Sequence, residues 1–161
     1  MKEIIIEATS LEKAADYLNR YADELDKQSA NIVAAMLQSG EEQAADNLGH
    51  VDTGETLSTL ASYQNGNEGT IQIGGNAIWI EFGTGVVANQ GQNEHPMKEA
   101  LGLSPWGTYG EGHGSDEGGW FYPGDDGHYH HTYGIPANYF FYNTAQMLRR
   151  QYAKIAKEVF K

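Results

Sequence analysis

A stripe of apolar residues at helical spacing lies near the N-terminus of this chain and limits the folds that it can adopt. Its members follow one another at steps of three and four residues: Leu11, Ala15, Leu18, Ala22, Leu25, Ser29, Ile32 and Met36. Side chains with this spacing lie on one face of an α-helix. Thr9 and Glu12 have the spacing of a capping box, which predicts the start of the helix. Gly40 is expected to break or kink it, and a second short helix is expected to end at Gly49.

Short β-rich segments are predicted on both sides of this helix. They are residues 3–7 (EIIIE), 57–63 (LSTLASY), 70–74 (TIQIG) and 77–82 (AIWIEF). Turn signals at Asn65-Gly66 and at residues 74–76 separate the last three, which indicates an antiparallel meander. In a strand, alternate side chains face opposite ways. Glu81 is therefore not expected to be buried with Ile78 and Ile80.

The segment 86–134 has a different texture, because regular periodicity disappears there. It holds 11 of the 20 glycines and five of the six histidines, so it is predicted to be a long insertion. Residues 118–134 within it indicate a hairpin with a Pro-Gly-Asp-Asp-Gly turn. A last helix follows, with an apolar stripe and a separate basic stripe. The apolar stripe is Leu148, Tyr152, Ile155 and Val159, and the basic stripe is Arg150, Lys154, Lys157 and Lys161.

Length and composition favour one α+β domain over residues 1–161, with two helices packed on a small antiparallel sheet. There is no cysteine, and no apolar run has the length of a signal peptide or a membrane span. The net charge is −12, which disfavours general binding to nucleic acid. The charge is also uneven: the insertion carries seven acids and one base, and residues 145–161 carry five bases and one acid.

Histidines in the insertion raise the question of metal binding. His128 and His130 lie beside Asp125, and imidazoles on one side of a strand can bind zinc. The signal is weak, because no HExxH helix accompanies it, and a solvated hairpin with paired His and Tyr side chains fits equally well. Neither a nucleophile elbow nor a phosphate-binding glycine pattern occurs. We therefore expect no enzyme activity, no cofactor and no bound metal.

The insertion is also rich in aromatic residues, which suggests a recognition surface for a sugar or a protein, or a small satellite core. These residues are Trp106, Tyr109, Trp120, Phe121, Tyr122, Tyr129 and Tyr133. A metal- or carbohydrate-binding module that uses the His/aromatic insertion is thus one hypothesis for function.

Three short motifs, in order, carry a resemblance to a known family. They are VDTGETL (Val51 to Leu57), WIEFGTG (Trp79 to Gly85) and IPANYFFYNTA (Ile135 to Ala145), placed between a long N-terminal helix and a last helix. This order resembles the phage morphogenesis family of head–tail joining, or tail-completion, proteins found in long-tailed phages and prophages of Gram-positive bacteria. In that family an acid–aromatic–Gly-Thr motif closes a strand, and a proline–aromatic stretch opens the C-terminal helix.

The resemblance implies a structural virion protein without catalytic residues. Copies would form a ring, expected to be a hexamer, at the neck that joins the tail to the head, after assembly in the host cytoplasm. Other connector and tail-tube proteins would be its partners, and DNA would pass through the ring without specific binding. Glu81 would accept hydrogen bonds from turn amides or from a neighbouring subunit's base. The residues expected at turns and interfaces are Asp52, Thr53, Gly54, Glu81, Phe82, Gly83, Thr84, Gly85, Pro136, Phe140, Arg150, Lys154 and Lys157.

Overall fold

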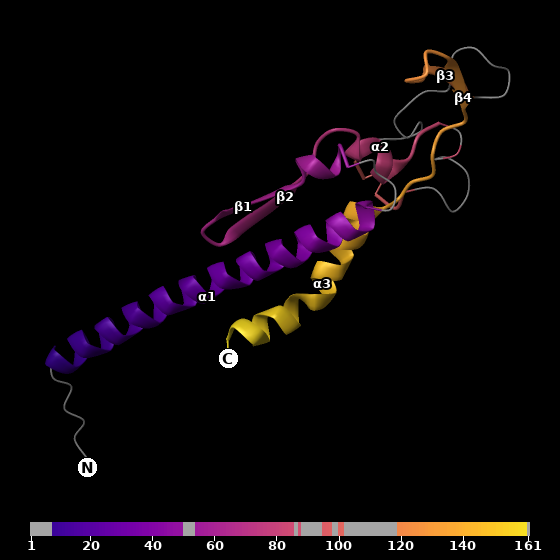
Figure 1. Ribbon diagram of the computed structural model, residues 1–161. Coiled ribbons are helices and arrows are strands. Elements are labelled where there is room, and N and C mark those ends of the chain that lie inside the picture. Colours follow the sequence, from indigo (N-terminus) through magenta and orange to yellow (C-terminus); the bar gives the residue numbers. More distant parts are fainter. Residues whose placement is uncertain are drawn as a thin grey trace.

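The computed structural model describes residues 8–49, 54–85, 87, 95–97, 100–101 and 119–160. These residues form an α+β fold, which confirms the predicted class (Figure 1). The elements are α1 (Ala8–Leu48), the 3-10 helix η1 (Leu57–Thr59), β1 (Ala61–Asn65), β2 (Glu68–Gln72), α2 (Ala77–Phe82), β3 (Trp120–Pro123), β4 (Tyr129–Thr132) and α3 (Phe140–Val159). The strand predicted over residues 3–7 lies outside the described residues.

The first helix is longer and simpler than the sequence predicted. α1 runs without a break through 41 residues, so the expected break at Gly40 is wrong. It starts at Ala8, which places Thr9 inside the helix rather than at its N-cap. Gly40 serves packing instead: a Cβ there would lie 2.5 Å from Cδ1 of Ile71 and 3.0 Å from Cδ1 of Leu148. The predicted end at Gly49 is confirmed, and its N–H donates to the carbonyl of Ala45.

The apolar stripe of α1 is covered over only part of its length. α3 begins beside the C-terminal end of α1, where Asn47 Nδ2 donates to the carbonyl of Phe140 at 3.4 Å. Ile32 is buried, whereas Leu11 and Leu18 near the N-terminus are 60% and 62% exposed. This N-terminal half projects beyond the rest of the described chain (Figure 1). Packing within one chain therefore leaves the N-terminal part of the apolar stripe exposed.

The hairpin β1–β2 lies along α1, and its turn was predicted correctly. The two strands pair antiparallel from Ala61 opposite Gln72 to Asn65 opposite Glu68, and Gly66 in the turn has φ +57°. Gly69 lets β2 approach α1 closely, since a Cβ there would lie 2.8 Å from Cγ1 of Val33. β2 pairs only with β1 among the described strands.

The strand predicted over residues 77–82 is a helix. Residues 77–82 form α2, with the N–H of Trp79 and of Ile80 bonded to the carbonyl of Asn76. The predicted alternation of faces is therefore wrong, and Ile80 and Glu81 are both buried. A short apolar run does not by itself distinguish a strand from a buried helical turn. Here Gly75, with φ +58°, turns the chain into the helix.

The buried core lies where α2 meets the end of α1 and the start of α3. It comprises Leu48, Ala77, Ile80 and Phe140, with Leu57, Ile73 and Phe141 partly buried against it. Further along α3, Ile155 is buried as predicted, but Tyr152 is 54% exposed and leaves the predicted apolar stripe. The predicted hairpin in the insertion is confirmed as β3 and β4, which form a second two-stranded sheet.

Candidate functional site

Glu81 is the centre of a buried junction between α2 and α3. Its Oε2 accepts the backbone N–H of Phe141 at 2.8 Å, and its Oε1 accepts that of Tyr142 at 2.9 Å. Oε1 also lies 2.8 Å from Nε2 of His95. The residue is only 6% exposed. Three partners within its own chain thus engage both oxygens of this carboxylate.

This carboxylate replaces the missing cap of α3. The N-cap residue Tyr139 is in the left-handed region, with φ 61° and ψ 25°, and its side chain makes no capping bond. The first N–H groups of a helix lack partners within it and carry partial positive charge. Glu81 supplies an acceptor and a negative charge there. Backbone bonds hold the two segments together, because Asn138 and Tyr139 donate to the carbonyls of Ile80 and Glu81.

His95 completes the junction, and no sequence pattern predicts this contact. Its Nδ1 accepts the backbone N–H of Met97 at 3.0 Å, which leaves Nε2 as the donor to Glu81. The ring is buried among Phe82, Tyr139 and Tyr142, with centroids at 4.3, 5.2 and 5.5 Å. His95 lies in the insertion, where no periodicity marks a buried position. No sequence signal would have paired it with Glu81.

A buried Glu–His pair can serve as an acid–base dyad when its atoms can reach a substrate. A general base must reach its substrate within hydrogen-bond distance, directly or through one water. Both nitrogens of His95 and both oxygens of Glu81 already have partners in the chain. The two residues are 4% and 6% exposed. Among the described residues, the pair holds the start of α3 through these bonds.

The glycines after Glu81 fasten the same junction on its other side. Gly83 and Gly85, which are expected at a turn, have φ of 73° and 63°, conformations that favour glycine. Between them, the N–H of Thr84 donates to the carbonyl of Ile135, and its hydroxyl accepts the N–H of Ile135. Gly134 lies so close that a Cβ on it would overlap the carbonyl oxygen of Thr84. The EFGTG turn and the segment before α3 thus form one unit.

The other predicted turn and interface residues fall into different places. Asp52 and Thr53 lie outside the described residues, and Gly54 has φ +96°. Pro136 is exposed. Phe140 is 1% exposed and belongs to the core.

The predicted basic stripe lies on the exposed surface of α3. Arg150, Lys154 and Lys157 are all exposed, and none forms an ion pair with a residue that the structure describes. Lys161 lies outside the described residues. The stripe is thus a row of cations on the outside of α3.

The histidine hairpin pairs its own groups. Nε2 of His130 lies 3.0 and 3.1 Å from the two oxygens of Asp126, and the N–H of His128 donates to the same carboxylate. The His130 imidazole and the His128 amide lower the pKa of the Asp126 carboxyl below its usual value of 3.8. The described residues contain no group of three His, Asp or Glu side chains placed to hold a metal. Asp125 contributes no second carboxylate to His130.

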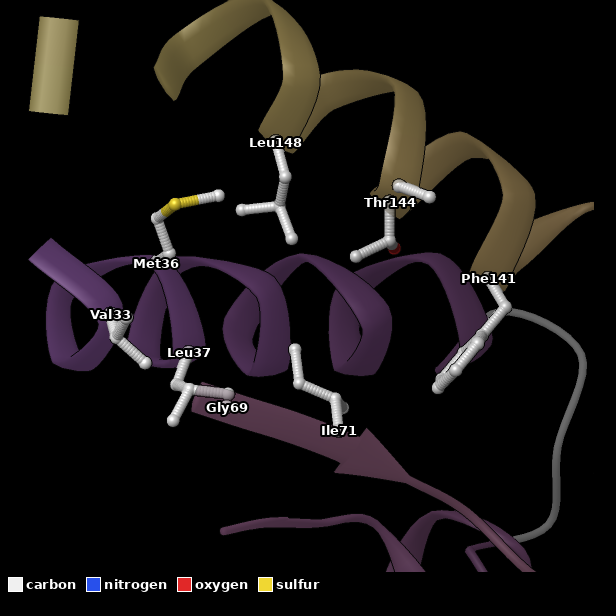
Figure 2. Close-up of a pocket in the computed structure, with 9 residues that line it drawn as sticks. Val33, Met36, Leu37, Gly69, Ile71, Phe141, Thr144 and Leu148 are labelled. Atoms are coloured by element: carbon white, nitrogen blue, oxygen red, sulfur yellow. The ribbon is translucent and has the colours of Figure 1, made fainter. Parts of the chain in front are cut away.

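An apolar groove lies between α1, β2 and α3 (Figure 2). It has a volume of about 350 Å³. In Figure 2, α1 runs between β2 on one side and α3 on the other, and their side chains converge on the groove. Its lining residues are Val33, Met36, Leu37, Gly69, Ile71, Phe141, Thr144, Ala145 and Leu148.

Comparison with known proteins does not assign the chain to a family. No protein-family model, curated protein or solved structure matches it. Among the helices of the described residues, none has an apolar stretch that could cross a membrane.

Proposed function

We propose that this chain is a structural protein of a phage or prophage virion, in the neck or tail-completion complex. Copies assemble as a ring that joins the tail to the head, with other connector and tail-tube proteins as partners. The expected symmetry is six-fold, and the chain acts without catalysis or a cofactor.

The observation that carries the proposal is the junction at Glu81. Two of the three motifs that carry the resemblance to head–tail joining proteins, WIEFGTG and IPANYFFYNTA, meet there. Glu81 bonds to amides 60 and 61 residues further along the chain. An acid, an aromatic and two turn glycines are thus needed together with the segment that opens the last helix. Because the two motifs bond to each other, their residues have a physical reason to occur together in one chain.

Two surface features favour assembly as the role of the chain. The exposed apolar half of α1 and the exposed cations of α3 have no partner among the described residues. Large apolar patches left exposed on a protein commonly mark interaction sites. A contact between two different surfaces of the same chain repeats from copy to copy, and it closes into a ring when the rotation allows.

Electron microscopy tests this proposal. In a map of a virion or prophage particle that contains the chain, we expect a six-fold ring at the junction of tail and head. A map that places the chain outside the neck and tail would overturn the proposal.

The alternative, a metal- or carbohydrate-binding module, has one observation in its favour. The second hairpin exposes aromatic rings that could stack on sugars, with Tyr129 74% and Phe121 57% exposed. Elemental analysis of untagged protein and a glycan-binding screen distinguish the two functions. One metal per chain that is lost in the double variant His128→Ala/His130→Ala, or saturable sugar binding that is lost in Tyr129→Ala, would favour this alternative.

A further inference from the structure

The apolar groove between α1, β2 and α3 has the shape and chemistry to receive an extended apolar segment. Met36 and Leu37 of α1 line it, with Ile71 of β2 and Leu148 of α3 (Figure 2). β2 pairs with β1 on one edge, and no other described strand pairs with it. A free strand edge is a template for the addition of another strand. The groove therefore fits a β-strand with apolar side chains on one face.

The chain itself carries such a segment in residues 3–7, Glu-Ile-Ile-Ile-Glu. When this segment is extended, Ile4 and Ile6 share one face, and Ile5 lies on the other face with the two glutamates. Only one of the two faces is wholly apolar. Beside β2, that face would turn toward the groove with Ile71, while Glu3 and Glu7 would stay in water.

The segment cannot reach the groove of its own chain. Val33 lies 25 residues after Ala8 along one straight helix, about 37 Å away at 1.5 Å per residue. Ile4 precedes Ala8 by four residues, and this stretch spans at most about 14 Å. The shortfall does not depend on what precedes Ile4. Any occupation of the groove by these isoleucines must come from a second copy.

From this geometry we infer that residues 3–7 of one copy add a strand to β2 of the next copy, with Ile4 and Ile6 in its groove. This inference rests on the proposed ring, and it names the contact that builds it. The exposed apolar half of α1 follows the segment at once, since Leu11 is 60% exposed. Residues 3–7 and the exposed apolar stripe of α1 would therefore form one continuous apolar surface against the neighbouring copy. The contact joins two different surfaces, as a ring requires.

Trapping between chains tests the inference with the full-length protein. The chain has no cysteine, so engineered thiols give a clean readout. Chains with Ile6→Cys are mixed with chains carrying Met36→Cys, oxidised, and separated on a non-reducing gel. Ile5→Cys, on the opposite face of the same segment, is the matched control. We expect a disulfide-linked heterodimer that forms about tenfold faster with Ile6→Cys than with Ile5→Cys, because a disulfide needs close and oriented Cβ atoms.

Sedimentation velocity provides a second measurement. Ile4→Ser/Ile6→Ser should weaken association about 100-fold or more, because two isoleucines lose their burial, while Ile5→Ser should change it little. The inference is overturned if no heterodimer forms, if both cysteine positions react at the same rate, or if native mass spectrometry finds the groove filled by a retained apolar molecule.

Failure of this inference can be separated from failure of the proposed function. A ring at the neck without the disulfide would refute the contact between residues 3–7 and β2 of the next copy, but it would leave the proposed function standing. A disulfide in a protein that lies outside the neck would support this contact and refute the proposed function.

Discussion

A single carboxylate, Glu81, decides how the last third of the described chain is attached. It is buried, it caps a helix to which it does not belong, and it holds His95 in place. From the sequence, Glu81 is expected to accept hydrogen bonds from turn amides or from a base of a neighbouring subunit, and not to be buried with Ile78 and Ile80. The difference follows from the helical conformation of residues 77–82, which turns Glu81 inward.

Glu81→Gln should destabilise the folded chain. The variant keeps one oxygen but places an amide group against a backbone N–H donor or His95, and it removes the charge that stabilises the helix start. We expect the free energy of unfolding to fall by about 2–4 kcal/mol, from charged hydrogen bonds and one unsatisfied donor. Urea denaturation followed by circular dichroism measures it. Glu158→Gln, on the exposed surface of α3, is the control, and an equal midpoint for both variants would contradict the anchoring role.

Asp126 gives a prediction on pH. Hydrogen bonds from His130 and from the His128 amide lower the pKa of its carboxyl in the folded chain. The pKa of Asp126 is lower in the folded chain than in the unfolded chain, so its hydrogen bonds stabilise the fold at a pH above the unfolded pKa. This stabilisation is lost as the pH falls through the folded pKa. In a ¹³C NMR titration, His130→Ala should raise the pKa of Asp126 toward 3.8.

The matched control for this titration is His128→Ala. His128 contacts Asp126 through its backbone amide, which the substitution keeps, so the pKa of Asp126 should stay where it is. A shift of equal size in both variants would show that the hairpin, rather than the His130 imidazole, sets the pKa.

At the level of helices and strands, the sequence predicted local elements better than their contacts. The first and last helices and both hairpins follow from periodicity and turn residues, and they are confirmed. Errors arose where packing overrides local preference. Gly40 lies in a helix because Ile71 and Leu148 pack against it, and AIWIEF is helical because its short apolar run is buried on the core. Neither conformation can be predicted from the local sequence alone, because each depends on segments that are distant in the sequence.

The junction between the EFGTG turn and α3 depends on Gly134. A Cβ at this position would overlap the backbone of Thr84, and φ is +101°. Gly134→Ala therefore combines backbone strain with a clash that no side-chain rotation relieves. We expect the free energy of unfolding to fall by about 3 kcal/mol or more, measured by thermal and urea denaturation.

Gly54→Ala is the control for this substitution. Its φ of +96° is nearly the same, but no described atom lies within 4 Å of the added Cβ. It should lose about 1 kcal/mol from the left-handed conformation alone. If the two variants unfolded at the same midpoint, close contact with Thr84 would have no energetic role.

Considered as a whole, the molecule separates its charges. The net charge is −12, yet the outer surface of α3 carries a row of cations, whereas residues 86–134 carry seven acids and one base in the sequence. Partly exposed opposite charges attract across an interface and are screened by salt. If the cations of α3 meet acids of a neighbouring copy, assembly should weaken as ionic strength rises.

A ring at the neck must let DNA pass without binding it. Arg150, Lys154 and Lys157 could neutralise about three phosphates, while tight duplex binding draws on roughly six to ten such contacts. The negative charge of the remaining surface opposes even these three. We therefore expect no gel shift of nonspecific duplex DNA at micromolar protein in physiological salt. A clear shift that Lys154→Glu/Lys157→Glu abolishes would show that these cations serve phosphates, and that the neighbouring subunit is not their partner.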